Sequence, residues 1–300
     1  MQRKVIVLVG VALALCLPAS AQLDLKQELR RKFEVELHRV DAAFDGVAAA
    51  EFIDISSGEK IGFNAAAQLP TASVIKVPVL VELFRQAESN PDLLAGRRTI
   101  GSKNQVAGSG LLRLFGDGTS ALALEDIAKL MINISDNSAA NIVIDEVGMN
   151  NVNSLLATLG LRQTKLARHM MDSAAQARGE DNVSSAADGA ELMSRIARCD
   201  LPVSKDSCAK IRRILEIPQE AHPSKDPIPR QIAIAFKWGG NDGVSAAWAI
   251  VNQPARPYVM SIMTTYAGDA APTVRALSAA AWAYYSRLAG ANAYGTRVLR

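Results

Sequence analysis

The most informative residues of this 300-residue chain are serines that stand three positions before a lysine. On a helix, this spacing places a hydroxyl and an amine on one face, one turn apart. A neutral lysine amine in that position can take the hydroxyl proton, which turns the serine into a nucleophile. The spacing occurs in three pairs, which are Ser57–Lys60, Ser73–Lys76 and Ser207–Lys210. Spacing alone therefore does not identify a nucleophile.

The residues around each pair distinguish the three serines. Ser57 lies in a polar turn between two expected strands, and Ser207 lies in a charged helix. Ser73 opens an apolar helix, expected over residues 71–87, whose burial would anchor the side chain. The backbone N–H of Ser73 would lie at the positive end of that helix, where an oxyanion is stabilised. The context therefore favours Ser73.

Two further motifs carry polar groups, although each has a simple structural interpretation when taken alone. Ser135-Asp136-Asn137 stands at a junction between two expected helices, where all three residue types serve as helix caps. Lys237-Trp238-Gly239 stands at the end of an expected strand and is followed by Gly240. Alone, this second motif is typical of a strand that runs into a glycine turn.

The three motifs together have a more specific meaning. Ser73-x-x-Lys76, Ser135-Asp136-Asn137 and Lys237-x-Gly239 occur in this order and context in class A β-lactamases and penicillin-binding proteins. The chain resembles that family from roughly residue 23 to residue 288, and the stretch Gly108–Arg113 is also similar to it. The resemblance implies that Ser73 attacks a strained or activated amide carbonyl and forms an acyl-enzyme.

The same resemblance implies how protons move. Lys76 would be the general base for acylation, and Ser135 would relay the proton to the departing nitrogen. An ordinary lysine pKa of about 10.4 is too high for a base at neutral pH. Burial and the second cation, Lys237, would both lower the pKa of Lys76.

Substrate binding is also implied by the resemblance. Asn137 would hold the substrate amide and orient Lys76, and Lys237 would attract the substrate carboxylate. The backbone N–H groups of Ser73 and Gly240 would form the oxyanion hole.

The long loop departs from the family pattern. Class A enzymes carry Arg-x-Glu there, and the glutamate activates the water for deacylation, whereas this chain has Arg168-His169-Met170. Met170 cannot act as a base. The nearest carboxylates lack the family spacing, and we interpret each as a solvated loop charge: Asp172, Glu180 and Asp181. The chain therefore has the residues that acylation needs, and it lacks the base that the family uses for deacylation.

Trp238 is a second departure from the family. The family usually has threonine or serine between the lysine and the glycine, and its hydroxyl helps to bind the substrate carboxylate. Tryptophan removes that contact and adds bulk beside the site. It would either stack on a substrate or narrow the pocket.

Hydrophobic periodicity predicts strands at both ends of the chain and helices between them. The expected strands are residues 47–55, 231–237, 245–251 and 258–265, and a turn at 57–60 leads into one more short strand. The expected helices are residues 23–44, 71–87, 122–134, 139–147, 152–159, 184–198, 207–215 and 270–288, with a loop over 162–182. We expect an α+β fold with three αβα layers, in which terminal helices cover one antiparallel sheet built from both ends. The α/β part would comprise residues 22–68 and 218–300, and an inserted helical lobe would comprise residues 69–217.

The N-terminus has the pattern of a secretory signal over residues 1–21. Arg3 and Lys4 precede an apolar run at 5–17, and Ala19-Ser20-Ala21 fits a cleavage site. An uncleaved anchor helix is the alternative, although the run is short for a span of about 20 residues. We therefore expect an exported protein, periplasmic or secreted, with no stable membrane anchor.

Charge and cysteine content restrict partners and cofactors. The formal net charge is +3, which gives no electrostatic footprint for a nucleic acid. Cys199 and Cys208 are close enough for a local disulfide in an oxidising compartment, and two free thiols are the alternative. The chain has no Cys-x-x-Cys and three scattered histidines, so we expect neither a metal nor another cofactor.

These observations support three functions for a chain that we expect to be monomeric. The first is a serine hydrolase that opens β-lactam amides, with altered deacylation. The second is a penicillin-binding D,D-peptidase-like enzyme that acts on cell-wall peptides. The third is a sensor that binds β-lactams without turnover.

Replacing Ser73 by alanine should abolish covalent labelling by a penicillin, because only Ser73 has Ser135 and Lys237 as downstream partners. Ser57→Ala and Ser207→Ala should leave labelling intact. Intact-protein mass spectrometry after incubation measures the added mass. Labelling that persists in Ser73→Ala would show that the nucleophile lies elsewhere.

Overall fold

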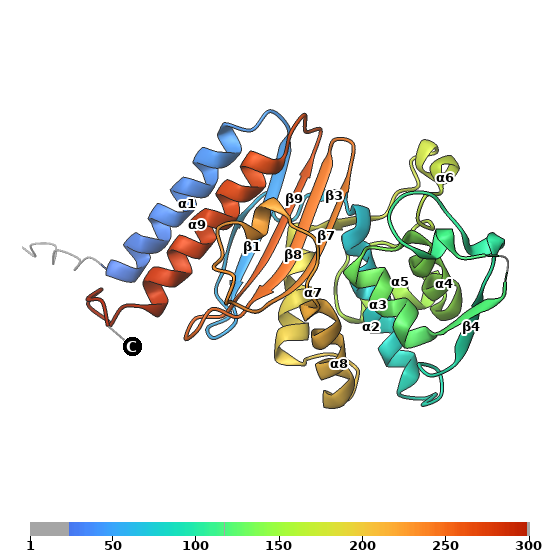
Figure 1. Ribbon diagram of the computed structural model, residues 1–300. Coiled ribbons are helices and arrows are strands. Elements are labelled where there is room, and N and C mark those ends of the chain that lie inside the picture. Colours follow the sequence, from blue (N-terminus) through green and yellow to red (C-terminus); the bar gives the residue numbers. More distant parts are fainter. Residues whose placement is uncertain (1–23, 117, 299–300) are drawn as a thin grey trace, which may run out of the picture.

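The structure is a computed structural model that describes residues 24–116 and 118–298. It has three layers: a pair of long helices, a five-stranded sheet and a group of shorter helices (Figure 1). This arrangement confirms the predicted three-layer fold. The expected signal peptide, residues 1–21, lies outside the described residues. No helix within the described ranges is long and apolar enough to cross a membrane.

The sheet joins the two ends of the chain, as the sequence predicts. Its strands are β1 (Val47–Asp54), β2 (Lys60–Phe63), β7 (Ile234–Asn241), β8 (Val244–Val251) and β9 (Tyr258–Thr265). Their order is β2-β1-β9-β8-β7, and all neighbours are antiparallel. The N-terminal and C-terminal parts meet where β1 pairs with β9, with Val47 opposite Thr265. Strand β7 is one edge of this sheet.

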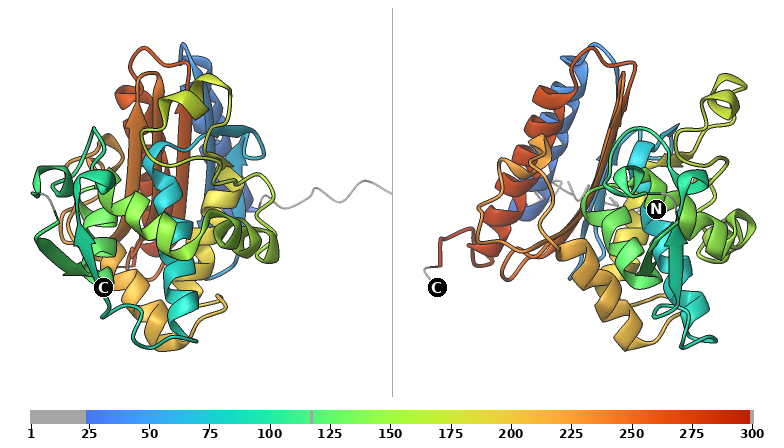
Figure 2. Two further views of the ribbon diagram at one scale, coloured as in Figure 1. Left: turned by 90° about the vertical axis from the view of Figure 1, so that its right-hand side faces the viewer. Right: turned by 45° about the vertical axis from the view of Figure 1, so that its right-hand side comes forward.

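Two long helices cover one face of the sheet. They are α1 (Leu25–Ala42) and α9 (Ala271–Ala289), which lie side by side (Figures 1 and 2). Phe33 of α1 stacks on Tyr284 of α9, with ring centroids 4.6 Å apart. Tyr285 stacks on Tyr258 of β9 at 4.2 Å. Aromatic burial of this kind fixes the terminal helices on the sheet.

The other face carries α7 (Ala186–Arg198), which packs against β1, β8 and β9. A Cβ atom at Gly189 would lie 2.4 Å from the ring of Trp248 on β8, so a glycine is required for this close approach. Beyond α7, helix α2 (Lys76–Ala87) is the buried centre of the helical group. Around it lie α3 (Leu124–Asn133), α4 (Asn137–Val147), α5 (Met149–Thr158) and α8 (Lys205–Glu216).

Several element boundaries differ from the prediction. A 3₁₀ turn, η1 (Ala72–Ile75), precedes α2, and β7 continues four residues beyond the predicted end at residue 237. The loop over 162–182 contains one short helix, α6 (Ser173–Ala177). Two short strand pairs were not predicted: β3 (Gln68–Pro70) with β6 (Val183–Ser185), and β4 (Arg97–Ile100) with β5 (Ser120–Ala123). Three short 3₁₀ turns were not predicted either: η2 (Ser102–Asn104), η3 (Leu112–Leu114) and η4 (Pro223–Lys225). Such short strands depend on partners distant in the sequence, which periodicity does not detect.

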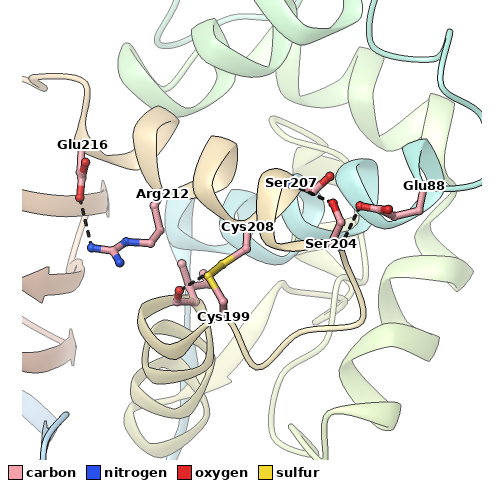
Figure 3. The surroundings of a disulfide bond; sticks show 8 residues. Glu88, Cys199, Ser204, Ser207, Cys208, Arg212 and Glu216 are labelled. Atoms are coloured by element: carbon pink, nitrogen blue, oxygen red, sulfur yellow. Dashed lines mark hydrogen bonds and ion pairs between the residues drawn. A yellow bond between two sulfur atoms is a disulfide. The ribbon is translucent and has the colours of Figure 1, made fainter.

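Cys199 and Cys208 form the predicted disulfide, which joins the end of α7 to α8 (Figure 3). Their Cα atoms are 5.7 Å apart. Cys199 ends α7 in the left-handed conformation, with φ 52°, and so turns the chain back. Ser204 then caps α8, and its N–H donates to Glu88 at the end of α2. The crosslink therefore fixes the α7–α8 corner beside α2.

Removing this crosslink should lower the free energy of unfolding by about 2–3 kcal/mol, the loop-closure entropy expected for so small a loop. The variant Cys199→Ser/Cys208→Ser should show this loss in urea denaturation. The wild-type protein under reducing conditions is the matched control and should lose a similar amount. A non-reducing peptide map of exported protein that shows two free thiols would contradict the disulfide.

Candidate active site

Ser73 lies in η1, where the chain turns directly into the buried helix α2. The residue before it, Ala72, has φ 44°, a conformation that costs a non-glycine residue on the order of 1–3 kcal/mol. Packing of η1 against β7 and β8 holds this turn in place. Ser73 therefore stands where the sheet meets the helical group, beside a cavity of about 520 Å³ that Asn137 and Gly240 also line.

Lys76 is fully buried one helical turn after Ser73. Its Nζ donates to the backbone oxygen of Ser135 at 2.7 Å and to Oδ1 of Asn137 at 2.8 Å, and lies 3.2 Å from the Ser135 hydroxyl. Burial lowers the pKa of Lys76 well below its ordinary value, and the neighbouring Lys237 cation lowers it further, while Asp136 opposes the shift. Both causes that the sequence predicts for a neutral Lys76 are therefore present.

Lys237 reaches the same serine from β7. Its Nζ donates to the Ser135 hydroxyl at 3.1 Å and to the backbone oxygen of Trp238 at 2.8 Å. Burial lowers the pKa of Lys237 to about 7, against the pull of Glu220 in the opposite direction. The Ser135 hydroxyl therefore lies between two buried lysine amines.

Ser135 holds this position because the turn between α3 and α4 is tightly bound. Ser135 itself has φ 55°. The buried carboxylate of Asp136 accepts the N–H of Ala139 at 2.9 Å, which caps α4, and the N–H groups of Leu111 and Leu112 at 2.7 and 2.8 Å. One carboxylate thus joins the Ser135 turn to the glycine-containing segment at 108–112, which lines the site. The capping interpretation is correct for Asp136, while Ser135 and Asn137 face Lys76.

The edge strand β7 passes very close to Ser73. A Cβ atom at Gly239 would lie 2.3 Å from the backbone nitrogen of Ser73, so only glycine fits there. Gly240, the next residue, is exposed and lines the Ser73 cavity. The structure thus brings Ser73, Gly239 and Gly240 together.

The loop after α5 closes the other side of the cavity. The backbone of Met170 is held by Asn141 through two hydrogen bonds, from Met170 N to Oδ1 at 2.8 Å and from Nδ2 to Met170 O at 3.1 Å. The Met170 side chain is buried, and Met170 lines the cavity together with Ser73. An apolar side chain therefore occupies this wall.

The three loop carboxylates have structural partners. Asp172 caps α6 by accepting the N–H of Ala175, and Glu180 forms an exposed ion pair with Arg178. Asp181 bonds the side chain of Arg168 at 2.8 Å, so our interpretation of Asp181 as a solvated charge was wrong. Arg168 is almost completely buried, which forces it to pair with a carboxylate. None of these three carboxylates lines the cavity.

Trp238 lies beside the site and packs against His222, with ring centroids 5.4 Å apart and the rings tilted by 31°. Together with Ser135 and Glu220, it lines a second cavity of about 260 Å³. Burial is the main cause that lowers the pKa of His222 to about 4, so this ring is neutral at pH 7. Trp238 therefore forms a wall of the site next to Ser135.

The other two Ser-x-x-Lys pairs lie outside this arrangement. Ser57 is in the turn between β1 and β2, where its N–H donates to Asp54. Ser207 is in the first turn of α8, beside the segment bonded to Glu88 at the end of α2 (Figure 3). Lys76 begins α2, and a 12-residue helix is about 18 Å long. Ser207 is thus distant from the two lysines of the site.

Comparison with known proteins agrees with this geometry. A profile of the beta-lactamase enzyme family matches residues 32–285. The chain belongs to this family. A β-lactamase from Streptomyces fradiae is 24% identical over 265 residues, which is 86% of each protein.

Solved structures of the family have the same fold. A β-lactamase from Sphaerobacter thermophilus is 25% identical with a TM-score of 0.75, over 85% of this chain and 97% of that one. PBP-A is 23% identical with a TM-score of 0.77, over 86% and 96% of the two chains. A class A β-lactamase from Mycobacterium abscessus is 19% identical with a TM-score of 0.77, over 85% and 99%. The resemblance inferred from the three motifs is therefore confirmed.

Sequence reasoning missed several residues of this β-lactamase-like site. Asn141 and Asn182 hold the loop backbone through their side-chain amides, and Glu220 approaches Lys237 from a segment with no regular structure. An asparagine within an apolar helix was the available signal for Asn141. Nothing in the local sequence marks Glu220, because its position depends on the fold.

The pH dependence of Ser73 acylation should report the Lys76–Lys237 contact. A lysine amine is a base only when it is neutral, so with Lys76 in the role that the family resemblance implies, the rate should rise with pH through the Lys76 pKa and then level. Lys237 in its charged form, below about pH 7, keeps that pKa low. In Lys237→Met the rise of the acylation rate should therefore occur at higher pH. Burial should still keep the pKa of Lys76 below the ordinary lysine range.

The measurement is the second-order labelling rate with an uncharged penicillin ester, followed by mass spectrometry from pH 5 to 10. An ester avoids any direct attraction between Lys237 and a substrate carboxylate. If the labelling rate rises at the same pH in the wild-type protein and in Lys237→Met, the two amines are not coupled.

Proposed function

We propose that this chain is a serine hydrolase that opens β-lactam amides through an acyl-enzyme on Ser73 and deacylates slowly. The observation that carries the proposal is the placement of the Ser135 hydroxyl between two buried amines, 3.2 Å from Lys76 and 3.1 Å from Lys237. The pKa values of both amines are lowered, which favours exchange of a proton with the hydroxyl between them. Membership of the beta-lactamase enzyme family supports the substrate class.

Acylation follows from the contacts of the two lysines. Neutral Lys76 takes the proton of the Ser73 hydroxyl while Ser73 Oγ bonds to the carbonyl carbon. The carbonyl oxygen becomes negative and is stabilised by the N–H groups of Ser73 and Gly240. The C–N bond then breaks, and Ser135 gives its proton to the nitrogen while it takes one from the lysines. The products are a serine ester and a neutral amine.

Deacylation needs a water molecule and a base on the open side of the ester. The cavity beside Ser73 provides space, and its wall is the buried Met170. Among the described residues that line this cavity, Asp242 is the one carboxylate, and it lies on the exposed turn between β7 and β8. A thioether cannot take a proton from water, so the ester persists.

A penicillin-binding D,D-peptidase-like enzyme, or a β-lactam sensor, is the second candidate. Two observations favour it: this chain shares the fold of PBP-A, and a variant of PBP-A has been solved as an acyl-enzyme complex with penicillin G. The apolar wall at Met170 is compatible with this candidate as well. The rate after the first turnover separates the candidates.

The wild-type protein should release about one equivalent of product from a chromogenic cephalosporin in a burst and then continue slowly. A positioned base contributes on the order of 10²–10⁴-fold to such a step. Met170→Glu should raise the steady rate on the order of tenfold or more and leave the burst unchanged. Stopped-flow absorbance measures both phases.

Met171→Glu is the matched control, because Met171 is the exposed neighbour that lines the same cavity. It should leave the steady rate low. Fast turnover without a burst in the wild-type protein would contradict slow deacylation, and a burst with no steady phase at all would favour the sensor.

A further inference from the structure

Lys237 stands on an edge strand of the described sheet, so it has one directly opposite neighbour there. That neighbour is Trp248 on β8, which pairs with Lys237 in the antiparallel register. Opposite residues of two antiparallel strands point to the same face, with Cβ atoms about 4.5–5.5 Å apart. Both side chains are fully buried, and Trp248 belongs to the core between the sheet and the helical group. The Trp248 ring therefore lies beside the stem of Lys237.

The other sheet positions around Lys237 on this face hold smaller side chains. They are Ala235 and Gly239 on β7, and Ala246 and Ile250 on β8. A lysine stem has four carbons, and an alanine or a glycine covers little of it. Trp248 is the one aromatic residue at these positions, so it forms the largest wall that the sheet offers to Lys237.

The Trp248 ring is held from behind by α7. The ring edge that carries Nε1 lies against Gly189, where a Cβ atom would be 2.5 Å from Nε1. Beyond the ring, the same row across the sheet continues with Ser261 on β9 and Glu51 on β1, which are neighbouring strands (Figure 1). Ser261 Oγ and Glu51 Oε1 are buried and have no hydrogen-bond partner among the described residues. The ring thus separates Lys237 from polar groups that could bind water.

The amine end of Lys237 has fixed targets. It donates to the Ser135 hydroxyl at 3.1 Å and to the backbone oxygen of Trp238 at 2.8 Å. A lysine stem is flexible, so an amine keeps such an aim only when packing holds the stem. Trp248 is placed to supply that packing.

Burial, rather than a neighbouring charge, is the main cause that lowers the pKa of Lys237 to about 7. Three described elements pack closely against β7, and their residues beside it are uncharged: β8 and η1 contain no charged residue, and the buried residues of α8 are uncharged. Titratable groups lie around the amine end instead: Lys76 on α2, Asp136 in the Ser135 turn, and Glu220 and His222 in the segment that leads into η4. The uncharged walls therefore decide how far water reaches Lys237.

We infer that Trp248 is a positioning residue for Lys237, whose ring keeps water from the lysine stem and holds the amine on the Ser135 hydroxyl. The role of that amine in acylation rests on the proposed function, whereas its placement does not. A smaller side chain at residue 248 would leave space beside Ser261 Oγ that water can occupy. Lys237 would then be better solvated, keep its proton to higher pH and lose its fixed aim.

Titration of the Lys237 amine in the folded protein tests this inference. Lysine labelled with carbon-13 at Cε gives one NMR signal for each lysine, and Lys237→Met identifies the signal of Lys237. The midpoint should lie at about pH 7 in the wild-type protein. It should rise in the order of the volume removed, to about pH 7.5 in Trp248→Phe and to about pH 8 or above in Trp248→Leu.

Trp282→Phe and Trp282→Leu are the matched controls, because Trp282 lies on α9, which covers the opposite face of the sheet. Both should keep the midpoint within about 0.3 of the wild-type value, since distant sites act independently. Trp248→Phe keeps the test decisive if Trp248→Leu does not fold. The inference is overturned by an unchanged midpoint in the Trp248 variants, by an equal change in the Trp282 variants, or by a wild-type midpoint near the ordinary lysine value.

The rate at which an uncharged penicillin ester labels Ser73 is the second readout. At pH 7, Trp248→Leu should be labelled about tenfold more slowly than the wild-type protein, and Trp248→Phe should stay within about threefold, because a loosened amine no longer holds Ser135. A slower rate without any change of the Lys237 midpoint would indicate a general loss of structure and would also overturn the inference. If the proposed function is wrong, neither the wild-type protein nor any variant is labelled at Ser73, while the titration still decides the role of Trp248.

Discussion

Two lysine amines share one serine hydroxyl in the interior of this protein, and the surrounding elements are arranged around that contact. Removing an ammonium group from water costs several kcal/mol, even after the protein relaxes. Burial lowers the pKa of both amines around Ser135, and the Lys237 charge lowers that of Lys76 further, so the pair holds fewer protons than it would in water. The same burial that opposes stability produces an amine able to accept a proton. Burial of the two amines thus lowers the stability of the fold and raises the basicity available at the site.

The layers of the fold follow from the need to bury these amines from two directions. Lys76 comes from α2, the most enclosed helix of the helical group, and Lys237 comes from β7 at the edge of the sheet. They meet only because η1 packs on β7, where Gly239 leaves room for the backbone of Ser73. The remaining partner, the Ser135 turn, is held by Asp136. The site therefore depends on the contact between sheet and helices.

Much of this arrangement could be predicted from the sequence, and the physical reasons for success and failure differ. Ser73, Lys76, Ser135, Asn137 and Lys237 belong to short motifs whose order in the chain is distinctive. The structure joins the last four by hydrogen bonds and places Ser73 on the cavity that Asn137 also lines. The sheet was predicted because its long strands are buried and continuous. The pairs β3–β6 and β4–β5 were missed because three or four residues carry no recognisable period. Asp181 was misread because its partner, Arg168, lies 13 residues away across a loop, and Glu220 was missed because only the fold brings it beside Trp238.

The loop that carries Met170 has its ends joined by the Arg168–Asp181 pair and by Asn182, whose side-chain oxygen accepts the N–H groups of Ala167 and Arg168. Closing a loop has an entropic cost that depends mainly on its length, and here the contacts at the ends offset that cost together with the two Asn141 bonds to the Met170 backbone. The bonds at Met170 are made by its backbone, so a different side chain at this position can keep them. In the mechanism that we propose, a lineage with this architecture gains or loses the hydrolytic half of the reaction by a single replacement, while the half that captures the substrate stays intact.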